Sequence, residues 1–393
     1  MSQHTGSDPV TSTNPATSSL PGPASTATWA VIAGGGTAGH TLPGIAIARA
    51  LVALGHDPAS LHFVGSERGS EARLVPAAGF DVTLLPGRGI QRRLTIANVG
   101  AVWGLLRALV RAFLLMVRHR PAVVVAMGGY ASVPCALAAV VLRVPIVVAE
   151  QNAVPGLANR LTSRFAKAAA VSFPGTALPR AVLTGNPVRP EVLAVDRGRD
   201  RAAARAALHI ADGQRVVLAF GGSLGSLRIN EAVVGALAAW LPRRDLTVRH
   251  VIGERDWVAL TEQAPTITEG VTYVPVRYED DMPRAFAAAD LVVCRSGATS
   301  VAELSAIGVP AVLVPLPGAP GDHQTANARA LVDAGAAILV PDAELTADRL
   351  VREVDALLAE EGRLEAMGTA ARRVAHRDAG RAVAALVEGH ARG

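Results

Sequence analysis

The chain has 393 residues, of which half are apolar and only 4% are aromatic. Because single hydrophobic cores seldom grow beyond about 250 to 300 residues, this length predicts two α/β domains, with buried parallel sheets covered by helices. The net charge of +5, carried by arginines and by a single lysine, Lys167, indicates anionic partners such as nucleotides or phospholipid headgroups. No zinc pattern or aromatic platform supports nucleic-acid binding, so we expect none.

The segment from Met1 to Thr28 is rich in Ser, Thr, Pro and Gly, and it has neither a positively charged start nor an apolar core. We therefore expect a disordered tail rather than a secretory signal. Cys135 and Cys294 are the two cysteines, and both lie in apolar runs. This predicts buried thiols in a cytoplasmic protein and argues against a disulfide framework or a zinc site.

The first predicted strand, Trp29 to Ala33, leads into a glycine turn, Gly34 to Gly39, and then a helical pattern through Leu54. Such a turn binds anions at the helix start, although it also serves merely to pack a strand on a helix. The contiguous glycines depart from G-x-G-x-x-G, and Glu67 follows the next strand only after a turn, which weakens a dinucleotide-binding interpretation. His40 ends the turn, where a neutral imidazole suits a general base.

The stretch from Ile90 to Met116 is predicted to be helical from about Ala97. Arginines interrupt its apolar run, so we expect it to lie on a membrane or to pack on the sheet rather than to span a bilayer. The preceding basic residues favour membrane contact. The apolar stripe is Val99, Val102, Trp103, Leu106, Leu109, Val110, Phe113 and Leu114, and the basic residues are Arg88, Arg92, Arg93, Arg107, Arg111 and Arg118.

Two pairs of segments echo each other. Ala122 to Asn159 and Ala289 to Asn327 each contain a strand, a glycine turn, a helix, a Val-Pro step, a second strand and a final Ala-Asn. Trp29 to Gly39 and Arg215 to Gly225 form the second pair. Two halves built alike predict two Rossmann-like domains that face each other, with the linker at Gly185 to Pro190.

The second half contains its own glycine turn, Phe220 to Ser226, ahead of a helix predicted from Asn230. Its backbone amides and the Ser223 hydroxyl suit a diphosphate. Asp280 and Asp281 are either metal ligands or helix-capping residues, and capping is the commoner role of adjacent carboxylates at a helix start. With no D-x-D in the chain, we expect no dedicated metal site.

In the segment from Ala289 to Asn327, a strand over Leu291 to Cys294 precedes a helix predicted over Thr299 to Ile307. The unpaired N–H groups of that helix start favour a phosphate. Glu303 is suited to accept hydrogen bonds from a ribose diol. It also completes a capping box, Ser300-x-x-Glu303, and the spacing leaves both roles open.

Seven ordered motifs together resemble the MurG family of bacterial N-acetylglucosaminyltransferases, which convert undecaprenyl-linked lipid I into lipid II during peptidoglycan synthesis. The motifs are GGGTAGHTLPG from Gly34, GGYAS from Gly128, EQNAVPGLANR from Glu150, GNPVR from Gly185, GGSLGS from Gly221, RSGATSVAE from Arg295 and DHQTANA from Asp322. The resemblance covers nearly all of the chain from Trp29 onward. It implies a two-domain α/β glycosyltransferase of the GT-B kind, with the acceptor held mainly by the first half and UDP-GlcNAc mainly by the second.

Carried over by position, the resemblance implies His40 as the catalytic base, with Asn152 and Glu150 as competitors. Glu303 would hold the ribose, and Ser223 with its glycine turn would hold the diphosphate. Ala38 stands where the family often has Gly, but it still offers a backbone N–H. The implied UDP-GlcNAc site comprises Thr37, Ala38, Gly39, Asn152, Arg189, Ser223, Glu279, Ala298, Thr299, Ser300, Val301, Ala302, Glu303 and Gln324.

We expect a tail over residues 1–28, an acceptor domain over 29–188, a donor domain over 189–366 and a C-terminal helix over 367–393 that packs back on the first domain. No cofactor or metal is expected. The expected location is the cytoplasmic face of the cell membrane, on anionic lipids, with cell-wall or division proteins as further partners. Two alternatives stay open: a sugar-nucleotide epimerase that needs no lipid, and a non-catalytic nucleotide-binding scaffold.

Overall fold

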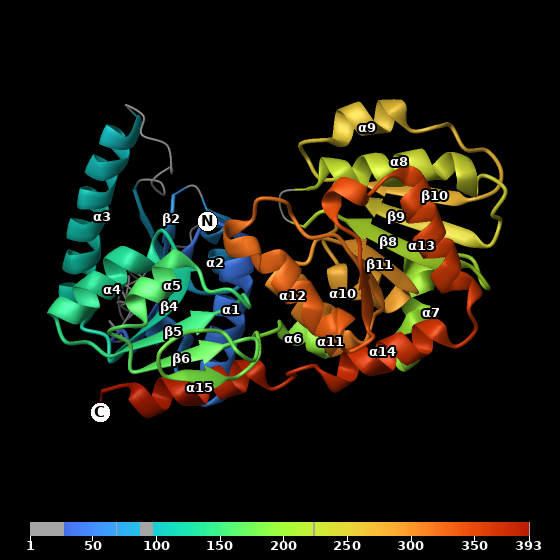
Figure 1. Ribbon diagram of the computed structural model, residues 1–393. Helices are drawn as coiled ribbons and strands as arrows, with labels where there is room; N and C mark the ends of the chain where they lie inside the picture. The colour runs from blue at the N-terminus through green and yellow to red at the C-terminus, as the bar shows by residue number, and fades with distance from the viewer. Residues whose placement is uncertain (1–26, 68, 87–96, 223–224, 393) are drawn as a thin grey trace, which may run out of the picture.

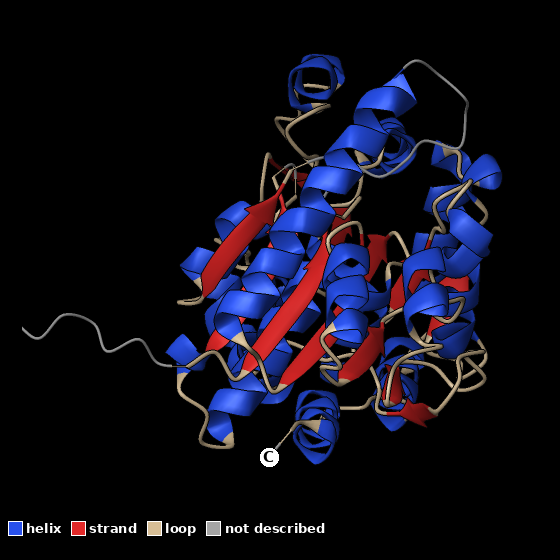
Figure 2. Ribbon diagram, turned by 90° about the vertical axis from the view of Figure 1, so that its left-hand side faces the viewer, coloured by secondary structure: helices blue, strands red, loops and turns tan. Residues whose placement is uncertain are grey.

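The structure is a computed structural model that describes residues 27–67, 69–86, 97–222 and 225–392, with the backbone alone for residues 97–102. Two parallel sheets with helices on their faces form two lobes that lie side by side (Figure 1). Figure 2 faces the first lobe and shows its strands running in one direction between layers of helices. The predicted pair of Rossmann-like domains is therefore confirmed.

The first sheet has seven parallel strands in the order β3-β2-β1-β4-β5-β6-β7, and the second has six in the order β10-β9-β8-β11-β12-β13. Strands β1 and β8 hold equivalent positions, as do β4 and β11, so both sequence echoes fall on matching strands. The strands are β1 (Ala30–Gly35), β2 (Leu61–Ser66), β3 (Asp81–Leu85), β4 (Val123–Gly129), β5 (Ile146–Glu150), β6 (Ala168–Val171), β7 (Ala181–Leu183), β8 (Arg215–Phe220), β9 (Leu246–Val251), β10 (Thr272–Val276), β11 (Leu291–Cys294), β12 (Ala311–Leu313) and β13 (Ala337–Leu339).

The helices cover the sheets, and three short 3₁₀ turns accompany them, η1 (Pro58–Ser60), η2 (Pro320–Asp322) and η3 (Asp342–Glu344). The central strands are buried from end to end, which requires helices on both faces. The helices are α1 (Ala38–Ala53), α2 (Glu71–Ala77), α3 (Ala97–His119), α4 (Ser132–Val141), α5 (Leu157–Thr162), α6 (Pro190–Leu193), α7 (Arg197–Ala207), α8 (Leu227–Trp240), α9 (Trp257–Gln263), α10 (Met282–Ala288), α11 (Ala298–Ile307), α12 (His323–Val332), α13 (Ala347–Ala359), α14 (Arg363–Arg373) and α15 (Ala379–His390).

The observed helix ends match the local capping residues better than they match the ends of the apolar pattern. Helix α8 begins before the predicted Asn230 because the Ser226 hydroxyl oxygen accepts a hydrogen bond from the Ile229 N–H at 3.3 Å. Helix α11 ends where expected, because Gly308 adopts φ 77°, a left-handed conformation that Gly reaches at little cost. Predicted helices are thus correct in number and type in these regions, and wrong by a few residues at their starts.

The described chain crosses between the lobes at two places. The first crossing lies between β7 and α6, where Gly185 to Pro190 was predicted as a linker. The second joins α14, under the second lobe, to α15, under the first (Figure 1). Val383, Ala384 and Val387 of α15 are buried in the core beneath the first sheet. The last helix therefore holds the two lobes together from below.

Candidate active site

The carboxyl ends of both sets of strands turn toward the space between the lobes. In each sheet the strand order reverses between the central pair, β1 and β4 in the first and β8 and β11 in the second. Ligands of open α/β sheets bind at such a reversal. The two predicted glycine turns follow β1 and β8, so they occupy the expected positions. Ser223 and Leu224 of the second turn lie outside the described residues.

The start of the first lobe's glycine turn lies very close to the end of β4. A Cβ on Gly129, whose φ is 77°, would lie 2.1 Å from the Gly35 carbonyl oxygen. The buried carboxylate of Glu71 fixes the turn from below, because its Oε1 accepts hydrogen bonds from the Gly36 N–H at 3.0 Å and from the Thr41 hydroxyl at 2.7 Å. The sequence interpretation weighed Glu67 at this point and missed Glu71.

His40 lies in the first turn of α1 at the floor of the cleft. Its Nδ1 is 3.4 Å from the Thr37 hydroxyl oxygen, and a Cβ added to Gly128 would lie 3.3 Å from its Nε2. Burial lowers the pKa of His40, Glu150 raises it in part, and His323 from the second lobe lowers it again. The imidazole is therefore neutral near pH 7, the form that accepts a proton.

Glu150, a competitor for the role of base, organises a loop instead. Its carboxylate is 3% exposed and accepts four hydrogen bonds, from the backbone N–H groups of Asn152 and Gly156 and from the side-chain amides of Asn152 and Asn159, at 2.9 to 3.3 Å. With its lone pairs engaged, the carboxylate is poorly placed to take a proton from a substrate. Asn152 carries an amide, which is not basic.

Asn327 joins the two lobes at the bottom of the cleft. Its Oδ1 accepts a hydrogen bond from the Ala153 N–H at 2.8 Å, and its Nδ2 donates to Asn152 Oδ1 and to the Ser296 carbonyl, each at 3.2 Å. Asn327 is fully buried. The loop after β5 and the turn after β11 are thereby held in register across the cleft.

The start of α11 is an anion-binding feature of the second lobe. Gly297 is its N-cap and provides no side-chain hydrogen bond, so the first N–H groups of the helix are open to a ligand. Beside them, the Thr299 hydroxyl is buried and has no hydrogen-bond partner among the described residues. A buried hydroxyl without a partner is costly, which favours a ligand oxygen at this position.

Glu303 is buried in α11 and pairs with Arg189 of the first crossing segment. The guanidinium donates from Nε and Nη2 to Glu303 Oε1, at 3.1 and 2.8 Å. Burial raises the pKa of Glu303, and Arg189 offsets part of that rise. The capping-box alternative is wrong, because the N-cap is Gly297 rather than Ser300 and the carboxylate faces Arg189.

Other predicted residues have different local partners. The Glu279 carboxylate accepts a hydrogen bond from Arg249 Nε at 2.6 Å and is turned toward β9, so its backbone rather than its side chain is free for a ligand. Gln324 Oε1 accepts from the Leu316 N–H at 2.9 Å, which shapes the loop after β12. Asp281 caps α10 through the Arg284 N–H, and among the described residues no group of three or more metal-ligating side chains occurs.

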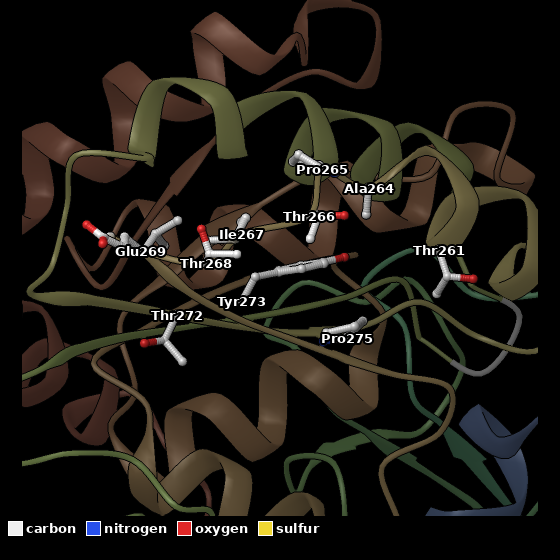
Figure 3. Close-up of a pocket in the computed structure, with 12 residues that line it drawn as sticks. Thr261, Ala264, Pro265, Thr266, Ile267, Thr268, Glu269, Thr272, Tyr273 and Pro275 are labelled. Atoms are coloured by element: carbon white, nitrogen blue, oxygen red, sulfur yellow. The ribbon is translucent and has the colours of Figure 1, made fainter.

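A hollow on the second lobe lies elsewhere. It has a volume of about 510 Å³ and is lined by the loop before β10 and by Tyr273 and Pro275 (Figure 3). None of the predicted site residues lines it. We therefore place the candidate site at the cleft, where groups from both lobes converge.

The structure brings His40 and Asn152 of the first lobe close to His323 and Asn327 of α12 in the second, and Thr37 lies beside His40. Sequence reasoning missed Glu71, and it missed the bridging role of Asn327 although that residue lies in a quoted motif. Arg73 was also missed. It crosses the cleft, with Nη2 3.4 Å from the Tyr278 hydroxyl, and no local pattern signals this contact.

Comparison with known families matches both lobes. The family model described as the glycosyltransferase family 28 N-terminal domain matches residues 30–171, and that of the C-terminal domain matches residues 216–383. A protein of Nocardioides sp. is 45% identical over 358 residues, which are 91% of this chain and 96% of the relative. A protein of Mycolicibacterium paratuberculosis is 45% identical over 363 residues, which are 90% of this chain and 86% of the relative. Both are named UDP-N-acetylglucosamine–N-acetylmuramyl-(pentapeptide) pyrophosphoryl-undecaprenol N-acetylglucosamine transferase.

Solved structures agree. The crystal structure of Acinetobacter baumannii MurG matches with a TM-score of 0.72 and 30% identity, over 92% of this chain and 99% of that one. A UDP-GlcNAc 2-epimerase from Neisseria meningitidis matches with a TM-score of 0.63 but only 12% identity. The match covers 92% of this chain and 100% of that one. The second likeness concerns the fold alone.

Removing the Glu150 carboxylate tests its role in organising the loop after β5. Glu150→Ala leaves four donors without their acceptor, so we expect a loss of about 3 kcal/mol in the free energy of unfolding, measured by urea denaturation. Because Glu150 raises the pKa of His40, the imidazole should also titrate at lower pH in the variant, as followed by NMR.

The matched control is Glu254→Ala, which removes a carboxylate whose side chain is 80% exposed. It should change stability by less than about 0.5 kcal/mol. Equal stability of the two variants would contradict the role given to Glu150.

Proposed function

This chain belongs to glycosyltransferase family 28 and, within it, to the MurG enzymes, and we propose which of its residues bind the donor and carry out the transfer. The protein is a GT-B N-acetylglucosaminyltransferase that moves GlcNAc from UDP-GlcNAc to undecaprenyl-pyrophosphoryl-MurNAc-pentapeptide, converting lipid I into lipid II in peptidoglycan synthesis. The observation that carries the residue assignment is the convergence of His40, Asn327 and Glu303 on one cleft.

In the proposed mechanism His40 accepts the proton of the muramyl 4-hydroxyl as that oxygen attacks the anomeric carbon of GlcNAc. The glycosidic bond to UDP breaks, the configuration inverts from α to β, and UDP leaves as the anion. A neutral, partly buried imidazole at the base of the cleft supports this role.

The departing diphosphate develops negative charge that preorganised donors can stabilise. The unpaired N–H groups at the start of α11, the Thr299 hydroxyl and the glycine turn after β8 support this part of the site. The start of α1, with Thr37, Ala38 and Gly39, faces the same cleft from the acceptor lobe. Holding both substrates between these groups supplies acceleration through positioning as well as charge.

Glu303 is proposed to hold the ribose diol. Its Oε1 is engaged by Arg189, which leaves Oε2 for the hydroxyl groups. Arg189 would then keep the carboxylate ionised and stand ready to contact a phosphate. Ser300, Val301 and Ala302 line the same helix, and Asn152, Gln324 and the backbone of Glu279 complete the proposed donor site.

The acceptor is bound to a membrane, so the enzyme must reach a lipid surface. Helix α3 has the exposed apolar and basic residues that suit such contact. It stands at the outer edge of the first lobe, away from the second (Figure 1). Its buried side is narrow, whereas Trp103, Leu106 and Leu114 are 62%, 50% and 61% exposed, with Arg107 and Arg111 exposed beside them. Among the described helices, none combines the length and apolar character that crossing a bilayer requires.

We therefore assign α3 to peripheral contact with anionic lipids on the cytoplasmic side of the cell membrane. The basic residues predicted at Arg88, Arg92 and Arg93 lie outside the described residues. Exposed apolar residues on α4 and α5, which pack in series on α3, extend the apolar surface; they are Leu137, Val141, Leu157 and Leu161. Contact with cell-wall or division proteins stays a prediction.

The two alternatives predict different requirements. A sugar-nucleotide epimerase would consume UDP-GlcNAc without a lipid, and the solved epimerases share only the fold with this chain at 12 to 15% identity. A nucleotide-binding scaffold would release no UDP. Release of UDP that depends on a soluble lipid I analogue supports the transferase, and release without it would support the epimerase.

Replacing His40 by Ala should reduce turnover about 10²- to 10⁴-fold while UDP still binds, since the proton acceptor is lost but the donor site is not. Turnover is measured by UDP release and binding by calorimetry. Because burial lowers the pKa of His40, the acid limb of the wild-type profile of kcat/KM should lie below pH 6.5, with activity lost as the pH falls and the base becomes protonated.

His390→Ala, near the end of α15, is the control and should keep wild-type turnover. If His40→Ala turned over at the wild-type rate, His40 would not be the base.

Glu303→Gln tests the ribose contact. The wild type should bind UDP about tenfold more tightly than 2′-deoxy-UDP, because the carboxylate accepts a hydrogen bond from the missing hydroxyl. The variant should bind both nucleotides with similar, weaker affinity. Glu365→Gln on α14 is the control, and an unchanged preference in Glu303→Gln would remove the ribose role.

Changing Trp103, Leu106 and Leu114 together to Ser should lower the fraction of protein that cosediments with phosphatidylglycerol vesicles at least about fivefold, because the apolar contact is lost. Activity on a soluble lipid I analogue should persist. The control is Val258→Ser in α9, a side chain that is 63% exposed on the second lobe. Equal cosedimentation of the two variants would contradict membrane contact through α3.

A further inference from the structure

Glu71 is a buried carboxylate at the start of α2, beside the segment that carries His40. It is 2% exposed, and its Oε2 has no hydrogen-bond partner among the described residues. A buried charge and an oxygen without a partner both cost free energy, because each loses the hydrogen bonds that water would provide. The proposed transfer mechanism gives this side chain no part. A carboxylate at this place therefore indicates a role beyond packing.

Neighbouring glycines leave room for the Glu71 side chain. A Cβ added to Gly65 of β2 would lie 2.6 Å from the Glu71 Cβ, too close for two carbon atoms. A Cβ added to Gly35 would lie 3.5 Å from Glu71 Oε1, in contact with it. The end of β2 thus admits the carboxylate, which reaches the turn that follows β1.

The carboxylate holds both ends of the segment from Gly36 to Thr41, in which His40 lies. At one end Oε1 accepts a hydrogen bond from the Gly36 N–H at 3.0 Å, and at the other it accepts one from the Thr41 hydroxyl at 2.7 Å. The Ser70 hydroxyl, 2.8 Å from that of Thr41, is free to donate to it, since Thr41 gives its own proton to Glu71. One oxygen atom thereby fixes where the segment begins and where it ends.

The segment needs this support because α1 begins weakly. Its N-cap, Thr37, makes no capping hydrogen bond through its side chain, and the first turn contains no acidic residue. Pro43 lies inside the helix and has no N–H, so the Gly39 carbonyl lacks the donor that a regular helix would supply. The turn that carries His40 is therefore held from outside α1, and Glu71 supplies that contact.

We propose that Glu71 is a positioning residue for the transfer, which holds the segment from Gly36 to Thr41 so that the His40 imidazole meets the acceptor hydroxyl. This inference rests on the proposed role of His40 as the base. Because its carboxylate is buried, Glu71 acts through the segment rather than on a substrate. A base works only within hydrogen-bond reach of its proton, and a displacement of about 1 Å lowers a rate by up to about 10²-fold.

The test compares Glu71→Met with Glu71→Gln, two side chains of similar length. Gln keeps an oxygen that accepts both hydrogen bonds, whereas Met offers only a weakly accepting sulfur. Met suits a buried place, so the variant should fold, which thermal unfolding checks. We expect Glu71→Met to lower kcat about 10- to 10²-fold and Glu71→Gln to keep at least about a third of it. The control, Glu67→Met, changes a side chain that is 52% exposed and should keep the wild-type kcat.

Thr41→Val is a second and independent variant. It removes one of the two hydrogen bonds to Glu71 Oε1 and nearly preserves the shape of the side chain, so it should lower kcat less, about three- to tenfold. Wild-type kcat in Glu71→Met or in Thr41→Val would overturn the positioning role.

UDP binding separates a loss of position from a loss of folded protein. In the proposed assignment the second lobe holds UDP, so calorimetry should give the same affinity and the same number of sites for Glu71→Met and the wild type. A number of sites that falls in proportion to turnover would show that unfolding caused the loss, and it would overturn the positioning role.

The His40→Ala background tests whether Glu71 acts through His40. With no base left to position, adding Glu71→Met should change turnover by less than about twofold. An equal loss in the wild-type and His40→Ala backgrounds would show that Glu71 acts by another route.

Titration of His40 followed by NMR needs no substrate. Burial lowers the pKa of His40, so a released segment that exposes the ring should raise this pKa toward its usual value in Glu71→Met. Removing the negative charge alone would lower the pKa, and Glu71→Gln should therefore not raise it. A pKa of His40 that stays or falls in Glu71→Met would contradict the proposal.

Failure of this inference differs from failure of the proposed function. Wild-type turnover in His40→Ala would remove the base and with it the role of Glu71. Impaired turnover in His40→Ala together with wild-type kcat in Glu71→Met would remove the positioning role alone and leave the proposed base in place.

Discussion

The two lobes act as one enzyme because a buried amide, that of Asn327, joins them at the base of the cleft. It accepts a hydrogen bond from the loop after β5 in the first lobe and donates to that loop and to the turn after β11 in the second. Strand β11 holds the position that β4 holds in the first sheet, and β5 is the next strand after β4, so the bridge joins loops at the carboxyl ends of central strands in both sheets. The carboxylate of Glu150 holds the first loop in shape, so the bridge meets a rigid partner. The fully buried Asn327 thus links the lobes, together with the contact of Arg73 with Tyr278 and the packing of α15.

Parallel sheets impose this arrangement. Their strands end at one edge, and the helices that follow start there with unpaired N–H groups. Glycine turns bring the backbones at that edge close enough to exclude side chains, as the approach of Gly129 to Gly35 illustrates. The cleft consequently presents backbone donors from both lobes, and the residues that must differ between the lobes are few. In the proposed assignment, His40 serves the acceptor side, and the pair formed by Glu303 and Arg189 serves the donor side.

The repeated strand order was predictable from the sequence because apolar strands, glycine turns and Val-Pro steps recur in it. The placement of His40 in the first turn of α1 and of Glu303 in the second turn of α11, each on a helix that follows a strand, agrees with the same pattern. The sequence pattern did not predict contacts between residues that are distant in sequence. Glu71 lies far along the chain from the turn that it holds, and Arg73 meets Tyr278 only because the lobes face each other. The capping box at Ser300 failed for a related reason: Gly297 already starts the helix, and a long-range partner, Arg189, takes the carboxylate.

The pairing of Arg189 with Glu303 gives the cleft a coupling between ligand and hinge. Arg189 belongs to the first crossing segment, directly after Val188, while Glu303 sits in α11 of the second lobe. Both side chains are mostly buried, so loss of either partner would leave the other charge buried and unpaired, which costs free energy. Under the proposed assignment, a ribose that shares the carboxylate, or a phosphate that attracts the guanidinium, would redistribute these hydrogen bonds. On that assignment, the donor nucleotide would contact the segment that connects the two lobes.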